Sequence, residues 1–127
     1  MISLSKFSSW LENGLKTMSQ EKAYCLNLFD DDDELTCELV GTNELHKEDD
    51  DWYFDETKVY GREKPLLICL TDNENNFESI MKKFTALLDK VVRSNKVIQN
   101  LLNKKPFAYG FIDGKLTFIE PNENELV

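Results

Sequence analysis

The chain has 127 residues, of which 41% are hydrophobic and 11% aromatic, and its formal net charge at pH 7 is −9. This composition supplies one core and excludes general disorder, and the negative charge argues against direct binding to nucleic acid phosphates. There is no apolar run of the roughly 18 residues that a transmembrane helix needs, and the N-terminus lacks the pattern of a secretory signal, so we expect a cytoplasmic protein with one domain over residues 1–127.

The first predicted element is an amphipathic helix over residues 4–18, where apolar residues recur at intervals of three and four. Ser3 or Ser5 is suited to be its N-cap, because a serine hydroxyl can accept a hydrogen bond from the first turn. Gly14 is unfavourable in the interior of a helix.

A β-hairpin is predicted next. Residues 23–29 and 35–40 have the composition of strands, and the four aspartates between them, residues 30–33, predict a polar turn. In the predicted register Phe29 pairs with Glu34, and this pairing determines which residues of the two strands lie opposite each other on each face of the sheet.

The chain has three cysteines, Cys25, Cys37 and Cys69, each within a largely apolar stretch and without CxxC spacing. This pattern predicts reduced, buried thiols, with a reactive thiol as the alternative. In the predicted hairpin register, the two thiols of the hairpin point to opposite faces and cannot form a disulfide.

The middle of the chain predicts a loop and two further strands. The loop covers residues 41–50, and the strand over residues 51–60 carries aromatic residues on both faces. Residues 66–70, directly after Pro65, form a continuous apolar run of strand length. We expect this to be the most buried strand.

Two helices follow. Residues 75–93 show helical apolar spacing over four turns, and Asn75 and Glu78 have the spacing of a capping box. A shorter helix is expected over residues 95–103, and Pro106 prevents its continuation.

The C-terminal part predicts a second hairpin, with strands over residues 107–112 and 115–119 joined by Asp113 and Gly114, and residues 121–127 as a frayed tail. The whole chain therefore predicts an α+β fold. Its antiparallel or mixed sheet of about five to six strands carries an N-terminal helix and two central helices.

Residues that carry chemistry in small enzymes and metal proteins are sparse. The single histidine, His46, lies in a polar loop, and the cysteines lack zinc-ligand spacing. Loops that start at Asp30 or Asp49 place Leu35 or Phe54 where a calcium loop requires glycine. There is also no nucleophile elbow and no phosphate-binding glycine motif, so we expect no metal, no cofactor and no catalytic residues. Adventitious divalent-cation binding by the aspartate turn is the alternative.

The negative charge is concentrated. Residues 27–56 hold thirteen acidic residues and one basic residue, Lys47, for a net charge of −12, whereas residues 77–105 carry +5. Such an acidic segment attracts basic protein surfaces. Within it, Asp49, Asp50 and Asp51 precede Trp52, which is either a solvated run ending at a core tryptophan or a recognition edge with an aromatic anchor.

Several short blocks resemble a known family. They are residues 38–42 (Glu-Leu-Val-Gly-Thr), Asp49-Asp50-Asp51-Trp52, Asp55-Glu56 and residues 110–114 (Gly-Phe-Ile-Asp-Gly). In this order they resemble small bacterial proteins found among the immunity proteins of polymorphic toxin systems, over residues 27–119. The resemblance implies a cytoplasmic protein that binds and neutralises a cognate toxin and has no catalytic activity.

We therefore predict a non-catalytic binding protein whose partner is a basic protein, such as a toxin domain, and not nucleic acid or a membrane. The predicted partner-binding residues are Asp30, Asp31, Asp32, Asp49, Asp50, Asp51, Trp52, Asp55 and Glu56. Two alternatives stay open: a small-ligand-binding domain or minor enzyme, and a homo-oligomer in which the acidic segment meets the basic residues 82–105 of a second copy.

Overall fold

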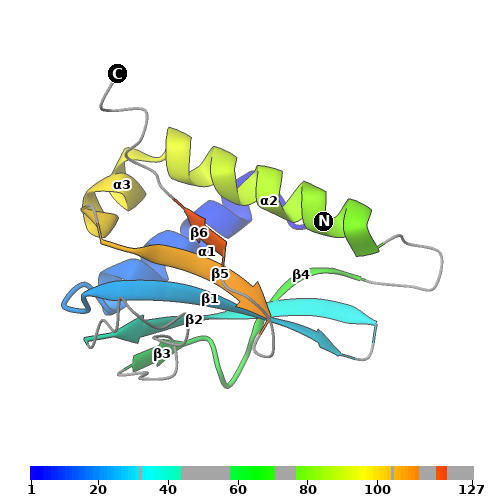
Figure 1. Ribbon diagram of the computed structural model, residues 1–127, viewed down its shortest axis with the longest axis horizontal. Helices are drawn as coiled ribbons and strands as arrows, with labels where there is room; N and C mark the ends of the chain where they lie inside the picture. Colours follow the sequence, from blue (N-terminus) through cyan, green and yellow to red (C-terminus); the bar gives the residue numbers. More distant parts are fainter. Residues whose placement is uncertain (32, 44–57, 71–76, 104, 112–116, 120–127) are drawn as a thin grey trace.

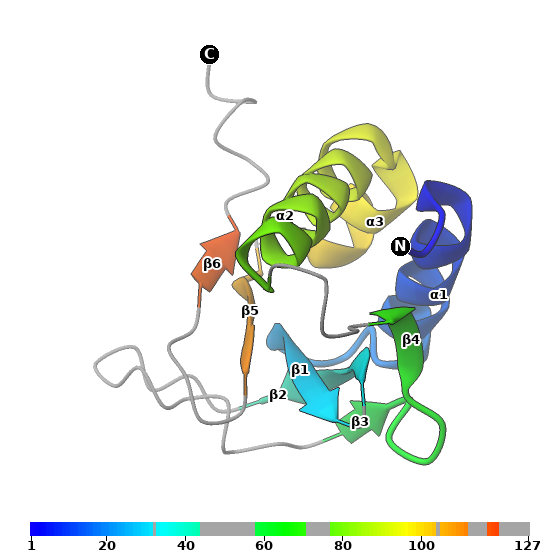
Figure 2. The same cartoon turned by 90° about the vertical axis from the view of Figure 1, so that its right-hand side faces the viewer.

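In the part of the chain that the structure describes, three helices cover one face of a mixed, six-stranded sheet (Figure 1, Figure 2). The computed structural model describes residues 1–31, 33–43, 58–70, 77–103, 105–111 and 117–119. The helices are α1 (Leu4–Thr17), α2 (Phe77–Ser94) and α3 (Lys96–Leu102). The predicted α+β fold, with an N-terminal helix and two later helices on a sheet, is confirmed.

The strands are β1 (Ala23–Asp31), β2 (Glu34–Thr42), β3 (Lys58–Tyr60), β4 (Leu66–Leu70), β5 (Phe107–Phe111) and β6 (Thr117–Ile119). Their order is β3-β2-β1-β5-β6, and β4 also pairs with β2. The β1–β5 pairing is parallel and the others are antiparallel. Helices α2 and α3 precede β5 in the chain and pack on the sheet, and β5 lies beside β1 (Figure 1).

The β1–β2 hairpin is confirmed, but its register differs from the predicted one by two residues. Asp31 pairs with Glu34, where the prediction pairs Phe29 with Glu34. The predicted turn over residues 30–33 is therefore too long, because its first two aspartates belong to β1. Asp33 has a φ of 62°, a left-handed conformation that aspartate tolerates better than most residues, and this permits a tight connection.

All three cysteines are free thiols. A register shift of two residues leaves every side chain on its predicted face, so Cys25, opposite Val40, and Cys37, opposite Leu28, point to opposite faces as predicted. Both are buried, whereas Cys69 is half-buried. The prediction of buried thiols is therefore wrong for Cys69, which lies near the end of β4.

Strand β4 coincides with the predicted strand over residues 66–70, but it is not the most buried strand. Within it only Ile68 is buried, while Leu67 and Leu70 are 44% and 63% exposed. Among the described strands β4 pairs with β2 alone, and their register shifts near Ile68. The prediction failed because an apolar run does not reveal how many strands lie beside it.

The residues around the other predicted strands are only partly described. Gly41 and Thr42, predicted to begin a loop, are the last residues of β2. The predicted pairing of the two C-terminal strands is confirmed by β5 and β6. Other predicted features lie outside the described residues: most of the strand over residues 51–60, the cap at Asn75, the turn at residues 113–114 and the tail over residues 121–127.

Helix α1 begins as predicted and packs closely on the sheet. The Ser3 Oγ accepts a hydrogen bond from the backbone N–H of Lys6 at 3.1 Å, which is the N-cap interaction. Gly14 is buried, and a Cβ there would lie 2.8 Å from Cδ2 of Tyr60 and 2.9 Å from Cδ2 of Leu39. The glycine that weakens the helix therefore allows it to approach β2 and β3.

Helices α2 and α3 lie where the sequence places them. Asn95 separates them and caps α3, since its Oδ1 accepts a hydrogen bond from the backbone N–H of Ile98 at 3.0 Å. Asn103 ends α3 in a left-handed conformation, and β5 begins just after Pro106. Aromatic contacts join the helical layer, as between Phe7 and Phe84, whose ring centroids are 5.8 Å apart.

Candidate functional site

The described acids of the predicted site lie where β1 turns into β2, at the end of the sheet that faces the viewer in Figure 2. Asp30, Asp33 and Glu34 have exposed side chains there, and we term these three residues the acidic hairpin end. Of the three, only Asp30 is a predicted binding residue, and the structure adds Asp33 and Glu34. The two nine-residue strands pair along their whole length, up to Asp31 and Glu34. Because this pairing fixes the backbone, a partner that binds these acids would need to order little of it.

The other predicted binding residues lie outside the described residues. They are Asp32, Asp49, Asp50, Asp51, Trp52, Asp55 and Glu56. The backbone of Asp30 and Asp31 is thus placed at the end of β1, and the grouping of the remaining residues with them stays a prediction.

The acids of the hairpin end are divided between the two faces of the sheet. Asp30 shares its face with the core residues of β1, on the side of the helices. The Cys69 thiol lies nearby, and burial raises its pKa. The N-terminal amino group and Lys83 lower this pKa, whereas Asp30 raises it, so positive and negative groups lie close together on this side. Glu34 lies on the other face, opposite Leu70.

One acid of the segment 27–56 is neutralised within the fold. The Glu38 carboxylate is 2% exposed and accepts two hydrogen bonds from the Arg62 guanidinium, from Nε and from Nη2, each 3.1 Å long. Asn27 Nδ2 donates a third, at 3.3 Å. Glu38 is therefore held by an internal ion pair and adds little negative charge to the surface.

The environment of the hairpin thiols argues against a reactive cysteine there. Burial and the Glu38 carboxylate raise the pKa of Cys25 to about 12. The same two causes raise the pKa of Cys37 even further. Because the thiolate is the reactive form, both side chains are unreactive near neutral pH.

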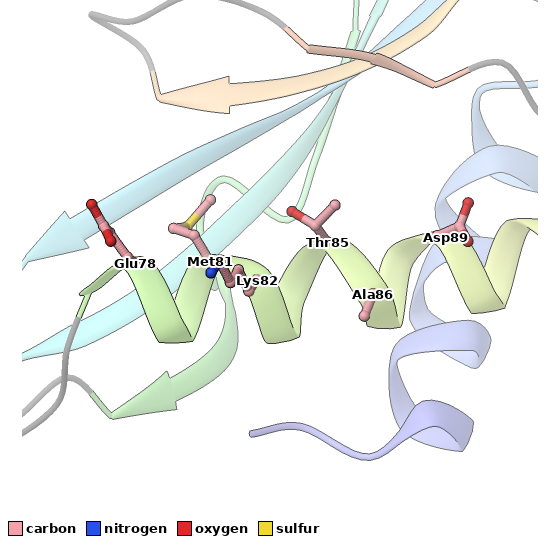
Figure 3. Close-up of a pocket in the computed structure, with 6 residues that line it drawn as sticks. All are labelled: Glu78, Met81, Lys82, Thr85, Ala86 and Asp89. Carbon is pink, nitrogen blue, oxygen red and sulfur yellow. The ribbon is translucent and has the colours of Figure 1, made fainter.

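Helix α2 presents a different surface. It carries the exposed Lys82 and Lys83, and its outer face lines a shallow groove of about 580 Å³ (Figure 3). The described residues that line the groove are Glu78, Met81, Lys82, Thr85, Ala86 and Asp89. These described residues all belong to one helix, and the groove is largely open to solvent. Its two carboxylates lie at opposite ends and do not converge as a catalytic pair would (Figure 3).

Two further properties concern only the residues that the structure describes. Among them, no three His, Cys, Asp or Glu side chains lie close enough together to hold a metal ion. No helix within these ranges is both long and apolar enough to cross a membrane.

Sequence reasoning missed two features near the acidic hairpin end. The first is the ion pair of Glu38 with Arg62, which joins residues 24 positions apart and has no local pattern. The second is the exposure of Leu67 and Leu70. Pro65, directly before the five-residue strand β4, indicates that this strand lies at an edge of the sheet, because proline and short length are typical of edge strands.

The chain was compared with known proteins at the level of family, sequence and structure. No protein-family model, no curated protein and no solved structure matches it.

Proposed function

We propose that the chain is a non-catalytic binding protein of the immunity type, which neutralises a cognate toxin by binding a basic surface of it. The charge distribution supports this proposal, since thirteen of the 24 acidic residues lie in the segment 27–56. A toxin that cuts nucleic acid has a basic surface for phosphates, and an acidic protein can compete for that surface.

The observation that carries the proposal is the exposure of acids on an ordered hairpin. Asp33 and Glu34 project from the turn between two fully paired strands and are exposed. A structural turn needs no such cluster, because like charges at neighbouring positions repel each other and lower stability. Their placement supports a role in attracting and orienting a basic partner.

Titration against the purified protein encoded in the adjacent reading frame tests the proposal. We expect tight, salt-dependent, stoichiometric binding, and a loss of about tenfold or more in affinity when Asp33 and Glu34 are replaced by lysine. The same loss is expected when Asp49, Asp50, Asp51 and Asp55 are reversed in charge.

Asp89→Lys on α2 is the matched control, because Asp89 is also exposed but lies in the helical layer and pairs with Arg93 at 2.8 Å. This variant should bind like the wild type. Tight binding that survives reversal of both acidic groups would refute the acidic surface, and absence of binding by the wild type would refute the proposed function.

A further inference from the structure

Two exposed leucines lie beside the acidic hairpin end. Leu67 and Leu70 of β4 are 44% and 63% exposed. They pair with Thr36 and Glu34 of β2, and both therefore lie on the sheet face that points away from the helices. Large apolar side chains on an outer strand promote unwanted association unless a partner covers them.

Their exposure is local. Further along the same face, Asn27, Glu38 and Val40 are buried, with exposures of 4%, 2% and 1%. Towards the hairpin end Thr36 and its partner Phe29 are half-buried, and they continue the row that starts at Leu67. The face thus changes from buried to exposed within a few residues, and the exposed part is largely apolar.

The border of this apolar patch is acidic on the side of the hairpin. The exposed Glu34 lies directly opposite Leu70, and the exposed Asp33 is its neighbour in the chain. At the other end of β4, Arg62 is held by Glu38 and the exposed Glu63 and Lys64 carry opposite charges. Among the residues that the structure describes, the border of the patch is therefore negative on balance.

We propose that Leu67 and Leu70, bordered by Asp33 and Glu34, are the docking surface for a protein that presents apolar side chains surrounded by lysine and arginine. An apolar centre with a charged rim is the usual anatomy of a specific interface. The negative rim fits a basic protein and repels anionic lipids and nucleic acid. This inference rests on the proposed function and names the apolar anchors beside which the acids lie.

The test is the affinity of the double variant Leu67→Thr/Leu70→Thr for the purified protein of the adjacent reading frame. Threonine keeps the strand propensity of β4 and removes most of the apolar contact. We expect the affinity to fall by at least about tenfold, mainly through faster dissociation. Val97→Thr is the matched control, because Val97 on α3 is 43% exposed, and it should bind within about twofold of the wild type.

Three results would overturn the inference. If the double variant keeps wild-type affinity while reversal of Asp33 and Glu34 weakens binding, the leucines are not anchors and the proposed function stands. If the wild type does not bind at all, the proposed function fails and the inference fails with it. If sedimentation shows a dimer of the free chain that the double variant abolishes, the surface belongs to a second copy.

Discussion

Glu38 and Arg62 illustrate how a single charge acquires its role from its surroundings. In composition Glu38 is one of many acids, yet its carboxylate is buried and bound by a guanidinium and an amide. A buried carboxylate is costly to desolvate and is tolerated only when it is paired and hydrogen-bonded. Arg62 precedes β4 by a few residues, so this pair also ties the start of β4 to the centre of β2.

Arg62→Met tests this arrangement. Loss of the guanidinium leaves a buried carboxylate without its counter-ion, and we expect the free energy of unfolding to fall by about 2 kcal/mol, less than for a fully buried pair because Arg62 is half exposed. Arg93→Met is the control, since the two arginine side chains are 53% and 54% exposed but Arg93 pairs with the exposed Asp89. Urea unfolding should show a change within about 0.5 kcal/mol for the control. Equal effects of the two substitutions would contradict the buried-pair interpretation.

At the scale of elements, close approach between layers decides which residues a position accepts. Gly14 lies where α1 meets Leu39 of β2 and Tyr60 of β3, and the Tyr60 ring is itself packed against Trp10 with 5.5 Å between centroids. A glycine in a helix interior is unfavourable by about 1 kcal/mol relative to alanine. The packing of the helix on the sheet makes it the suitable residue here.

Gly14→Ala is therefore expected to destabilise the protein. The gain in helix propensity is about 1 kcal/mol, but the new Cβ would require Tyr60 and Leu39 to move, and overpacking costs about 1–3 kcal/mol. We expect a net fall of about 1 kcal/mol in the free energy of unfolding. The neighbouring Asn13 is exposed, so Asn13→Ala should raise stability by a few tenths of a kcal/mol, roughly, through propensity alone. Thermal unfolding of both variants decides the matter, and a stabilised Gly14→Ala would show that the contact is not tight.

At the scale of the molecule, the described charges are unevenly distributed. Helix α2 carries the exposed Lys82, Lys83 and Lys90, while the turn of the first hairpin carries exposed acids. With a net charge of −9 and thirteen acids within thirty residues, repulsion among like charges opposes the compact state. In the proposed function, the positive charges of a bound basic partner would reduce this repulsion.

Salt should therefore stabilise the free protein. Raising sodium chloride from about 0.02 to about 0.3 M shortens the screening length, and we expect the urea midpoint to rise because repulsion among the acids weakens. Replacing Asp49, Asp50 and Asp51 by asparagine should reduce this response. Replacing Lys82 and Lys83 by glutamine should increase it, since the net charge becomes more negative. A response that is the same in all three proteins would show that the acidic segment does not lower stability.

Local pattern was enough to predict the helices, the first hairpin and the α+β class, because apolar periodicity and capping residues act over a few positions. The sequence also shows that more than half of the acidic residues lie in the segment 27–56. For the candidate site, the charge pattern predicted Asp30 and Asp31, which the structure places at the end of β1, while the other predicted residues lie outside the described residues.

The tertiary structure decided the features that depend on distant neighbours. The parallel pairing of β1 with β5, the burial of Glu38 against Arg62 and the contacts of Gly14 all join residues far apart in the chain. The exposure of β4 also depends on distant residues, because an apolar run predicts burial whether or not strands lie on both sides of it. Leu67 and Leu70 thus became exposed apolar neighbours of the hairpin acids only through the pairing of β4 with β2, because burial depends on what packs against a strand and not on its composition.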